Sequence, residues 1–284
     1  MPDAVPPSPA DPAVDPAARA GLDAWRAAYA QRLAAPDGWW ATCALHWLDE
    51  GTTVLGSGPD VDLVLPAPCP AHVATLHRDG PRVTVRPATP GTLWADDAPL
   101  DEAAVVEDAD RTLTLGPAPD APRFTVLVRG VRRAVRAYDP ARAAARDPAR
   151  EVAWYPLEPG WVVPATFVPA TGDETIPIVT MQGDVLDLPA AGRLRFEVAG
   201  GEHTLLATWA GEDLFVALRD AGSGPESYGA GRYLSVPAPS EGATWMDFQR
   251  AHHPPCAHSA FATCPLPPLE NRLPFVVRAG ERSA

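Results

Sequence analysis

The densest group of reactive side chains in this sequence lies between Trp245 and Arg272. The stretch reads WMDFQRAHHPPCAHSAFATCPLPPLENR and contains two of the four cysteines and three of the seven histidines of the chain. Its five prolines fix φ and remove backbone N–H donors, which excludes a helix interior or a central strand. We therefore expect a stiff, irregular loop, and long loops of this kind in compact domains are often functional.

The first interpretation of this loop makes Cys256 a nucleophile. The thiolate is the reactive form of cysteine, and it needs a neighbouring base or positive charge. His253 could supply the base, and Asp247 or Glu270 could orient its imidazole. A cysteine beside histidine and carboxylate groups favours hydrolysis or acyl transfer.

Three other interpretations stay open. Imidazole and thiolate groups suit zinc, with His253, Cys256, His258 and Cys264 as ligands, although H-x2-C-x-H-x5-C matches no standard zinc spacing. Alternatively, Cys256 and Cys264 form a disulfide, or both are small buried apolar groups. We expect no cofactor, with zinc as the one alternative.

The loop and its surroundings contain several short motifs: PPCA at 254–257, TCPLPP at 263–268, ENRLP at 270–274, GRYL at 231–234 and RAGE at 278–281. Together they resemble the signature of a bacterial family catalogued as domain of unknown function 1684, over roughly residues 20 to 282. In the family pattern an asparagine usually stands at the place of His253 and an aromatic residue at that of His258. The resemblance therefore implies a role for the two cysteines and implies no histidine metal site.

Arginine side chains are the main candidates for binding a substrate. Arg129 and Arg136 belong to the one basic cluster of the chain, and guanidinium groups bind carboxylates or phosphates through paired hydrogen bonds. The alternative is ion pairing with acidic residues of the chain itself. The segment DAGSGPESYGAGR at 220–232 could form one pocket wall facing the loop at 245–272. The candidate binding residues are Arg129, Arg136, Tyr228, Arg232, Arg250, Asn271 and Arg272.

Near the N-terminus the patterning predicts one helix, over about residues 16–34. Leu22, Trp25, Tyr29 and Leu33 recur at a spacing that places them on one helix face. Asp15 is the expected N-cap, so residues 15–50 form the helix and its lead-in. Residues 1–14 are rich in Pro, Ala and Asp, and we expect them to be disordered.

The rest of the chain predicts a mainly β protein. Short alternating runs divided by Gly, Pro and Asp favour a β-sandwich over residues 51–139. This half more weakly resembles the forkhead-associated fold, but Ser57 stands where that family needs an Arg, so phosphopeptide binding is not implied. Similar runs predict a second antiparallel β unit over 140–284, a barrel or a sandwich, which carries the loop. We expect Cys43 and Cys69 to serve in packing.

Composition restricts the possible partners. The net charge of −13 disfavours nucleic-acid binding, which depends on neutralising phosphates. No run approaches the roughly 20 apolar residues of a membrane-spanning helix, and the first residues lack a signal peptide's hydrophobic region. We expect a cytoplasmic bacterial enzyme that acts on a small, acidic metabolite through Cys256. The alternatives are a small-ligand-binding module without catalysis and a protein-interaction module in the first half.

Overall fold

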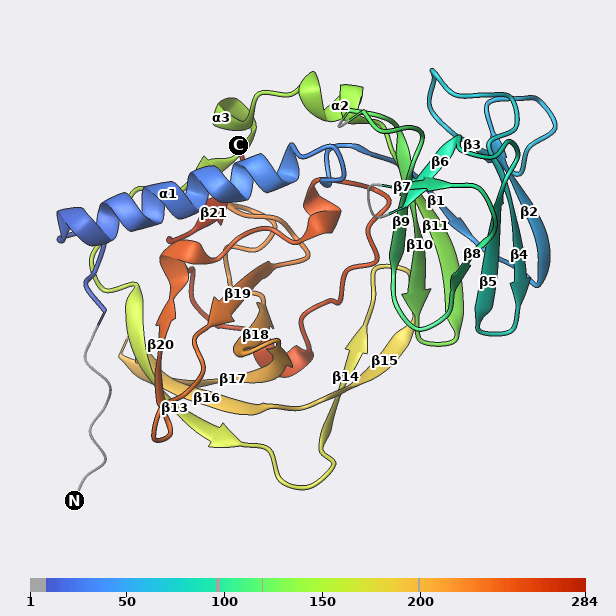
Figure 1. Ribbon diagram of the computed structural model, residues 1–284. Helices are drawn as coiled ribbons and strands as arrows, with labels where there is room; N and C mark the ends of the chain where they lie inside the picture. Colours follow the sequence, from blue (N-terminus) through green and yellow to red (C-terminus); the bar gives the residue numbers. More distant parts are fainter. Residues whose placement is uncertain (1–8, 96–97, 119, 199) are drawn as a thin grey trace. The chain divides into compact units, whose positions relative to one another are not determined.

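The computed structural model describes the chain in four segments: residues 9–95, 98–118, 120–198 and 200–284. They form two compact β-rich units (Figure 1). The first, called the sandwich unit here, comprises Gln31–Pro148 and Ser259–Ala262. The second, called the barrel unit, comprises the described residues up to Ala30 together with Ala149–His258 and Thr263–Ala284. The expected mainly β fold with an N-terminal helix is confirmed.

The sandwich unit consists of two sheets around one core. The strand orders are β1-β11-β10-β9-β6-β7 and β3-β2-β4-β5-β8. The strands are β1 (Thr42–Trp47), β2 (Gly51–Gly56), β3 (Leu63–Val64), β4 (Ala74–Asp79), β5 (Arg82–Pro87), β6 (Leu93–Ala95), β7 (Ala98–Leu100), β8 (Ala104–Val106), β9 (Arg111–Thr114), β10 (Arg123–Arg129) and β11 (Arg132–Tyr138). In β5, Val83 and Val85 are buried between less buried neighbours, because successive strand side chains point to opposite faces.

Both sheets contribute to the core of the sandwich unit. Leu76 of β4 and Phe124 of β10 belong to the same buried cluster. Cys43 and Cys69 pack against this cluster, which confirms the packing role expected for them. After β11, Asp139 caps the short helix α2 (Pro140–Ala144) through its side chain.

The barrel unit is built on a six-stranded antiparallel sheet of order β19-β18-β17-β16-β13-β20. Its strands are β13 (Val162–Pro169), β16 (Gly192–Val198), β17 (Gly201–Ala210), β18 (Asp213–Leu218), β19 (Arg232–Val236) and β20 (Ala243–Asp247). The edge strands β19 and β20 contact each other, so the sheet curls into a half-barrel (Figure 1). The remaining elements are α3 (Pro148–Glu151), whose last three residues belong to this unit, and the pairs β12 (Ala153–Trp154) with β21 (Glu281–Arg282) and β14 (Thr175–Val179) with β15 (Val185–Pro189).

Helix α1 (Pro16–Leu33) has the bounds and the apolar face that the sequence predicts. The Asp15 carboxylate accepts a hydrogen bond from the amide of Ala18 at 2.7 Å, as an N-cap does. Leu22, Tyr29 and Leu33 are buried and share one face. In the described parts of the chain, no helix combines the length and the apolar character needed to cross a membrane.

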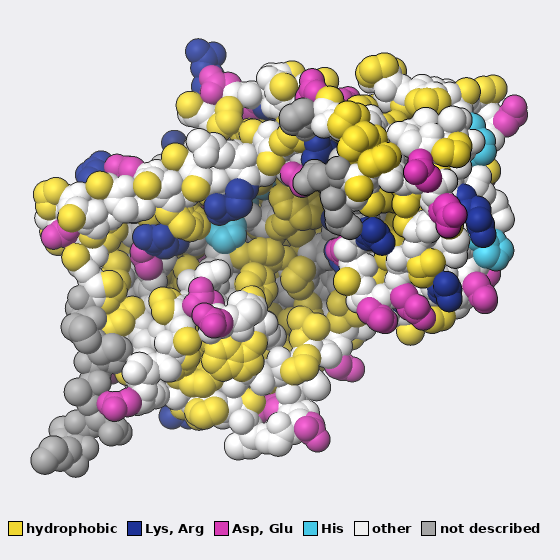
Figure 2. Space-filling view, viewed as in Figure 1, with side chains coloured by type: hydrophobic (Ala, Val, Ile, Leu, Met, Phe, Trp, Pro, Cys, Tyr) yellow, Lys and Arg dark blue, Asp and Glu magenta, His cyan; other side chains and the backbone are white. Residues whose placement is uncertain are grey.

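The disorder expected for residues 1–14 falls partly on residues 1–8, which lie outside the described segments. Within the described part, the Asp11 carboxylate accepts hydrogen bonds from the amides of Ala13 and Gly160, both at 2.9 Å. On the face drawn in Figure 2, acidic and basic side chains are interspersed with hydrophobic ones.

Candidate functional site

The stretch from Trp245 to Arg272 is irregular, as its prolines predict. It begins in β20 and contains three short 3-10 turns, η1 (Phe248–Arg250), η2 (Pro255–Ala257) and η3 (Leu269–Asn271). Pro254 and Pro268 occupy the N-cap positions of η2 and η3 in extended conformations. Proline fixes φ there, so the turns are positioned with little conformational freedom.

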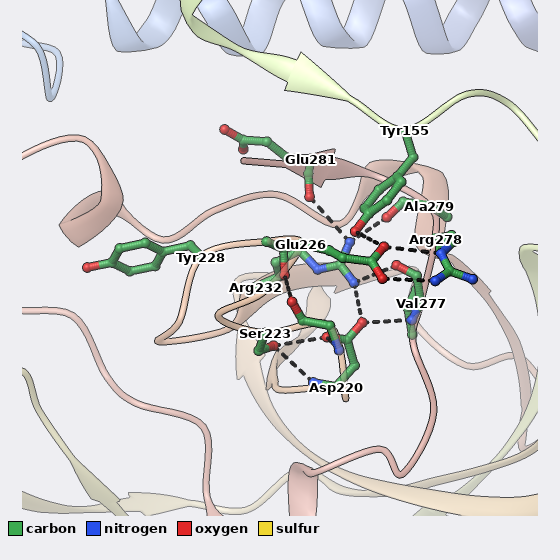
Figure 3. Close-up of polar contacts among 12 residues, drawn as sticks. Tyr155, Asp220, Ser223, Glu226, Tyr228, Arg232, Val277, Arg278, Ala279 and Glu281 are labelled. Atoms are coloured by element: carbon green, nitrogen blue, oxygen red, sulfur yellow. Dashed lines mark hydrogen bonds and ion pairs between the residues drawn. The ribbon is translucent and has the colours of Figure 1, made fainter. Parts of the chain in front are cut away.

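The neighbouring 220–232 loop is closed at its base by an ion pair (Figure 3). Arg232 Nη2 lies 2.7 Å from Asp220 Oδ2, and both side chains are 1% exposed. The same guanidinium donates to the carbonyl of Val277 at 2.9 Å, and the Asp220 carboxylate accepts from the Val277 amide at 2.7 Å. Buried inside the barrel unit, Arg232 thus joins the 220–232 loop to the C-terminal segment. The contact of Arg232 with a substrate, expected from the sequence, stays a prediction.

Tyr228, near the tip of this loop, points away from the Arg232 cluster in Figure 3. Its hydroxyl donates to the backbone carbonyl of Cys256 at 3.0 Å. Its amide donates to Nε2 of His253 at 3.1 Å. The 220–232 loop therefore contacts the 245–272 stretch, as expected, and three predicted site residues meet at this contact.

Cys256 and Cys264 are free thiols that contact each other. The amide of Cys256 donates to Sγ of Cys264 at 3.2 Å. A hydrogen bond from the Cys264 thiol lowers the pKa of Cys256 to about 7; burial opposes this shift and the Tyr228 hydroxyl adds to it. The bond to Cys256 and burial raise the pKa of Cys264. Near neutral pH the thiolate therefore forms on Cys256, while Cys264 keeps its proton.

His253 is held by a carboxylate that the sequence analysis did not single out. Nδ1 of His253 lies 3.2 Å from Oε1 of Glu281, whose side chain is 2% exposed. Oε2 of Glu281 accepts from the hydroxyl of Tyr29 at 2.9 Å and from the amide of His253 at 2.7 Å. Because Nε2 accepts from Tyr228, the hydrogen-bond network assigns the ring proton to Nδ1. Glu281, rather than Asp247 or Glu270, orients this imidazole.

The signal for Glu281 was present in the sequence as the last residue of the RAGE motif. Burial alone would raise the pKa of Glu281, but its hydrogen bonds and electrostatic interaction with His253, together with His258, hold it below its ordinary value. Nε2 of His258 lies 3.7 Å from Glu281 and 3.0 Å from the Tyr29 hydroxyl. Among the described residues, no three His, Cys, Asp or Glu side chains are grouped so as to hold a metal ion.

Asp247 and Arg250 form a second group. Oδ2 of Asp247 accepts from Nε of Arg250 at 3.0 Å, and Oδ1 accepts from the amide of Gln249 at 3.0 Å. Burial raises the pKa of Asp247, against the effect of Arg250. The pair lines a cavity of about 490 Å³ whose wall includes Trp25 and Trp245. In Figure 2, basic and histidine side chains gather along one side of α1.

The remaining candidates of the barrel unit lie elsewhere. Asn271 is buried, and its side chain bonds to the backbone of Leu206 in β17 and of Ala217 in β18. This amide connects two strands. Glu270 and Arg272, its neighbours in sequence, are exposed.

Arg129 and Arg136 belong to the sandwich unit. Arg129 pairs with Asp110 at 2.8 Å, which is the ion-pairing alternative considered for it. Arg136 is buried, lies over the ring of Trp39 at 4.7 Å, and donates to the carbonyl of Phe261 at 3.2 Å. Both therefore have partners within their own unit, and their binding of a substrate stays a prediction.

The fold and the site define a mainly β protein with a pair of free thiols in its second half. Residues 150–282 match the family described as "Protein of unknown function (DUF1684)", and the chain belongs to this family. The matched range contains both loops and Glu281. Comparison with proteins of curated function found no match.

A solved structure with sequence similarity is the solution NMR structure of an uncharacterized protein of Haloarcula marismortui. It is 31% identical over 46% of this chain and 76% of that chain, with a TM-score of 0.40.

Proposed function

We propose that this protein is a cytoplasmic enzyme in which Cys256 is the nucleophile that attacks an electrophilic carbonyl group of a small metabolite. The observation that supports this most is the contact between Cys256 and Cys264, in which the Cys256 amide donates to Sγ of Cys264 at 3.2 Å. Interaction with the Cys264 thiol lowers the pKa of the half-buried Cys256 thiol to about 7. About half of the thiol is then a thiolate near pH 7, and the thiolate is the form that attacks.

The proposed reaction proceeds through a thioester. The Cys256 thiolate adds to the carbonyl carbon, and the leaving group departs with its electron pair and takes up a proton. Water or another acceptor then removes the acyl group from the sulfur, which gives hydrolysis or acyl transfer. No separate base has to deprotonate the thiol, which is compatible with a His253 whose two ring nitrogens are occupied by Glu281 and Tyr228.

The arginines expected to bind an acidic substrate have partners within the protein. Arg232, Arg136 and Arg129 have protein partners, so they offer less support for an acidic metabolite than their sequence pattern did. Free thiols at Cys256 and Cys264 suit a reducing compartment, where disulfides rarely persist.

The test is acylation by p-nitrophenyl acetate, followed by peptide mass spectrometry. The expected result is a rapid burst of p-nitrophenol, one acetyl group on Cys256, and slow turnover. Cys256→Ala is expected to remove the burst, and Cys69→Ala is the matched control because Cys69 packs in the sandwich unit and its pKa is raised. An acetyl group that never appears on Cys256 contradicts the proposal.

A second candidate is a ligand-binding module, favoured by the cavity of about 490 Å³ beside Asp247 and Arg250. Two tryptophans give it apolar walls, and Arg250 adds a cation. The aromatic anion 1-anilinonaphthalene-8-sulfonate is a suitable probe. Arg250→Gln and Trp245→Phe are expected to weaken its binding, whereas Trp209→Phe, at an exposed tryptophan, is not. Equal affinities in all three variants would argue against this site.

A further inference from the structure

The two cysteines of the barrel unit are placed for more than a single nucleophilic attack. The amide of Cys256 donates to Sγ of Cys264 at 3.2 Å, so the Cys264 sulfur lies against the Cys256 residue. The Cys256 sulfur is three covalent bonds from this amide nitrogen, so a small rotation of its side chain can bring the two sulfurs together. The pair is therefore a dithiol and not two isolated cysteines.

The protein holds both cysteines in place from several directions. The carbonyl of Cys264 accepts from the amide of Met181 at 2.9 Å, and the carbonyl of Pro265 accepts from the hydroxyl of Tyr233 at 2.7 Å. Cys256 lies in the η2 turn, where the Tyr228 hydroxyl bonds its carbonyl. Since both are positioned by the fold, little ordering entropy opposes a reaction between them.

The two thiols are unequal in exposure and in protonation. Cys256 is half-buried, whereas Cys264 is only 4% exposed. The pKa of Cys256 is lowered to about 7, and that of Cys264 is raised. A small external molecule can therefore react with the Cys256 thiolate first. The more buried Cys264 thiol can react only in a second step. This division into an attacking and a resolving thiol suits thiol–disulfide exchange.

We propose that Cys256 and Cys264 reduce small organic disulfides by thiol–disulfide exchange, with Cys256 as the attacking and Cys264 as the resolving thiol. This activity shares the reactive Cys256 with the proposed acyl chemistry, but it needs Cys264 in addition and needs no carbonyl substrate.

The reaction balances in two steps. The Cys256 thiolate attacks one sulfur of a disulfide RSSR, the S–S bond breaks, and one thiolate RS⁻ leaves, so that a mixed disulfide forms on Cys256. Cys264 then gives its proton to RS⁻ and attacks the sulfur of Cys256, which releases the second RS⁻ to be protonated by solvent. Two electrons pass from the dithiol to RSSR, and the protein ends with a Cys256–Cys264 disulfide. A small external dithiol returns it to the reduced form.

Cys43 and Cys69, the other two cysteines of the chain, are internal controls for thiol reactivity. Burial, with the nearby Asp139 charge, raises the pKa of Cys43 to about 11, and burial raises that of Cys69. Both pack against the sandwich core. Neither has the chemistry to attack a disulfide at neutral pH.

The experiment exposes the reduced full-length protein to oxidised glutathione at about pH 7 and maps the cysteines by mass spectrometry. The expected product is a peptide pair joined through Cys256 and Cys264 that has lost two hydrogens, with two molecules of reduced glutathione released. Cys264→Ala is expected to trap one glutathione on Cys256, and Cys256→Ala to remain unmodified. Cys69→Ala serves as the matched control and should behave like the unchanged protein.

Three outcomes overturn this proposal: a lasting glutathione adduct on Cys256 of the unchanged protein, attack that begins at Cys264, or no reaction at either thiol. Cys256→Ser is the second variant if the alanine form does not fold. Acetylation by p-nitrophenyl acetate distinguishes this proposal from the acyl one. Cys264→Ala is expected to slow acetylation of Cys256, because the Cys256 pKa rises, and to abolish the internal disulfide altogether. An acetyl group on Cys256 without an internal disulfide in the unchanged protein overturns this proposal alone, and an internal disulfide without acetylation overturns the acyl proposal alone.

Discussion

The guanidinium of Arg232 and the carboxylate of Asp220 meet at 2.7 Å inside the barrel unit, and both side chains are 1% exposed. The pair closes the loop that carries Tyr228 to Cys256 and His253. A buried ion pair of this kind need not stabilise the fold more than apolar residues would, but it defines one arrangement of the loop. Arg232 is thus a positioning residue for the thiol pair.

Breaking this pair from one side is expected to destabilise the protein strongly. Arg232→Met leaves the Asp220 carboxylate buried without its cation, which costs about 3–5 kcal/mol. The measurement is the free energy of unfolding in urea. Asp23→Asn, which removes a partner from the exposed Arg19–Asp23 pair, is the control and is expected to cost about 0.3–0.5 kcal/mol. Similar losses in the two variants would contradict the prediction.

Stability is expected to depend on pH through Glu281. Its pKa in the folded protein is lowered from the ordinary value of 4.5, so its charge stabilises the fold above pH 4.5. This contribution is lost as the pH falls through the lowered pKa. The unfolding free energy of the unchanged protein should therefore exceed that of Glu281→Gln at neutral pH, and the difference should shrink in acid below 4.5. A difference independent of pH would show that ionisation is not involved.

Asn271 is expected to contribute to stability although it lies in an irregular segment. Asn271→Ala removes the partner of the Leu206 amide and of the carbonyls of Leu206 and Ala217. A buried polar group without a partner costs about 1–3 kcal/mol. Thermal and urea unfolding measure the loss, and Glu270→Ala at the exposed neighbouring position is the control with almost no expected change. A stable Asn271→Ala protein would argue against this connection between strands.

The reactivity of Cys256 is expected to depend on Tyr228. The Tyr228 hydroxyl is one of the groups that lower the pKa of Cys256 to about 7, so Tyr228→Phe should move this pKa upward. Cys264→Ala should move it further, because the Cys264 thiol is the larger cause. The pKa is measured from the pH dependence of alkylation by iodoacetamide. Tyr155→Phe is the matched control, since the Tyr155 hydroxyl contacts Glu226 instead. An unchanged profile in Tyr228→Phe would show that the Tyr228 hydroxyl does not lower the pKa of Cys256.

Local patterns in the sequence were sufficient for the secondary elements. The spacing of Leu22, Tyr29 and Leu33 predicted α1, and Asp15 predicted its start, because both signals act within a few residues. Alternation predicted the strands for the same reason. The prolines of the 245–272 stretch likewise excluded regular structure there, and its motifs carried the family resemblance that the comparison confirms.

Only the tertiary structure decided which of the reactive residues meet. Tyr228 and Cys256 are 28 residues apart, as are His253 and Glu281, and the fold brings each pair into hydrogen-bonding distance. The curling of the half-barrel and its hydrogen-bonded loops determines these contacts, and no local periodicity encodes them. The residue types of a thiol site were therefore readable in the sequence, whereas the pairing of Cys256 with Cys264 and Tyr228, and of His253 with Glu281, depended on the long-range packing of the chain.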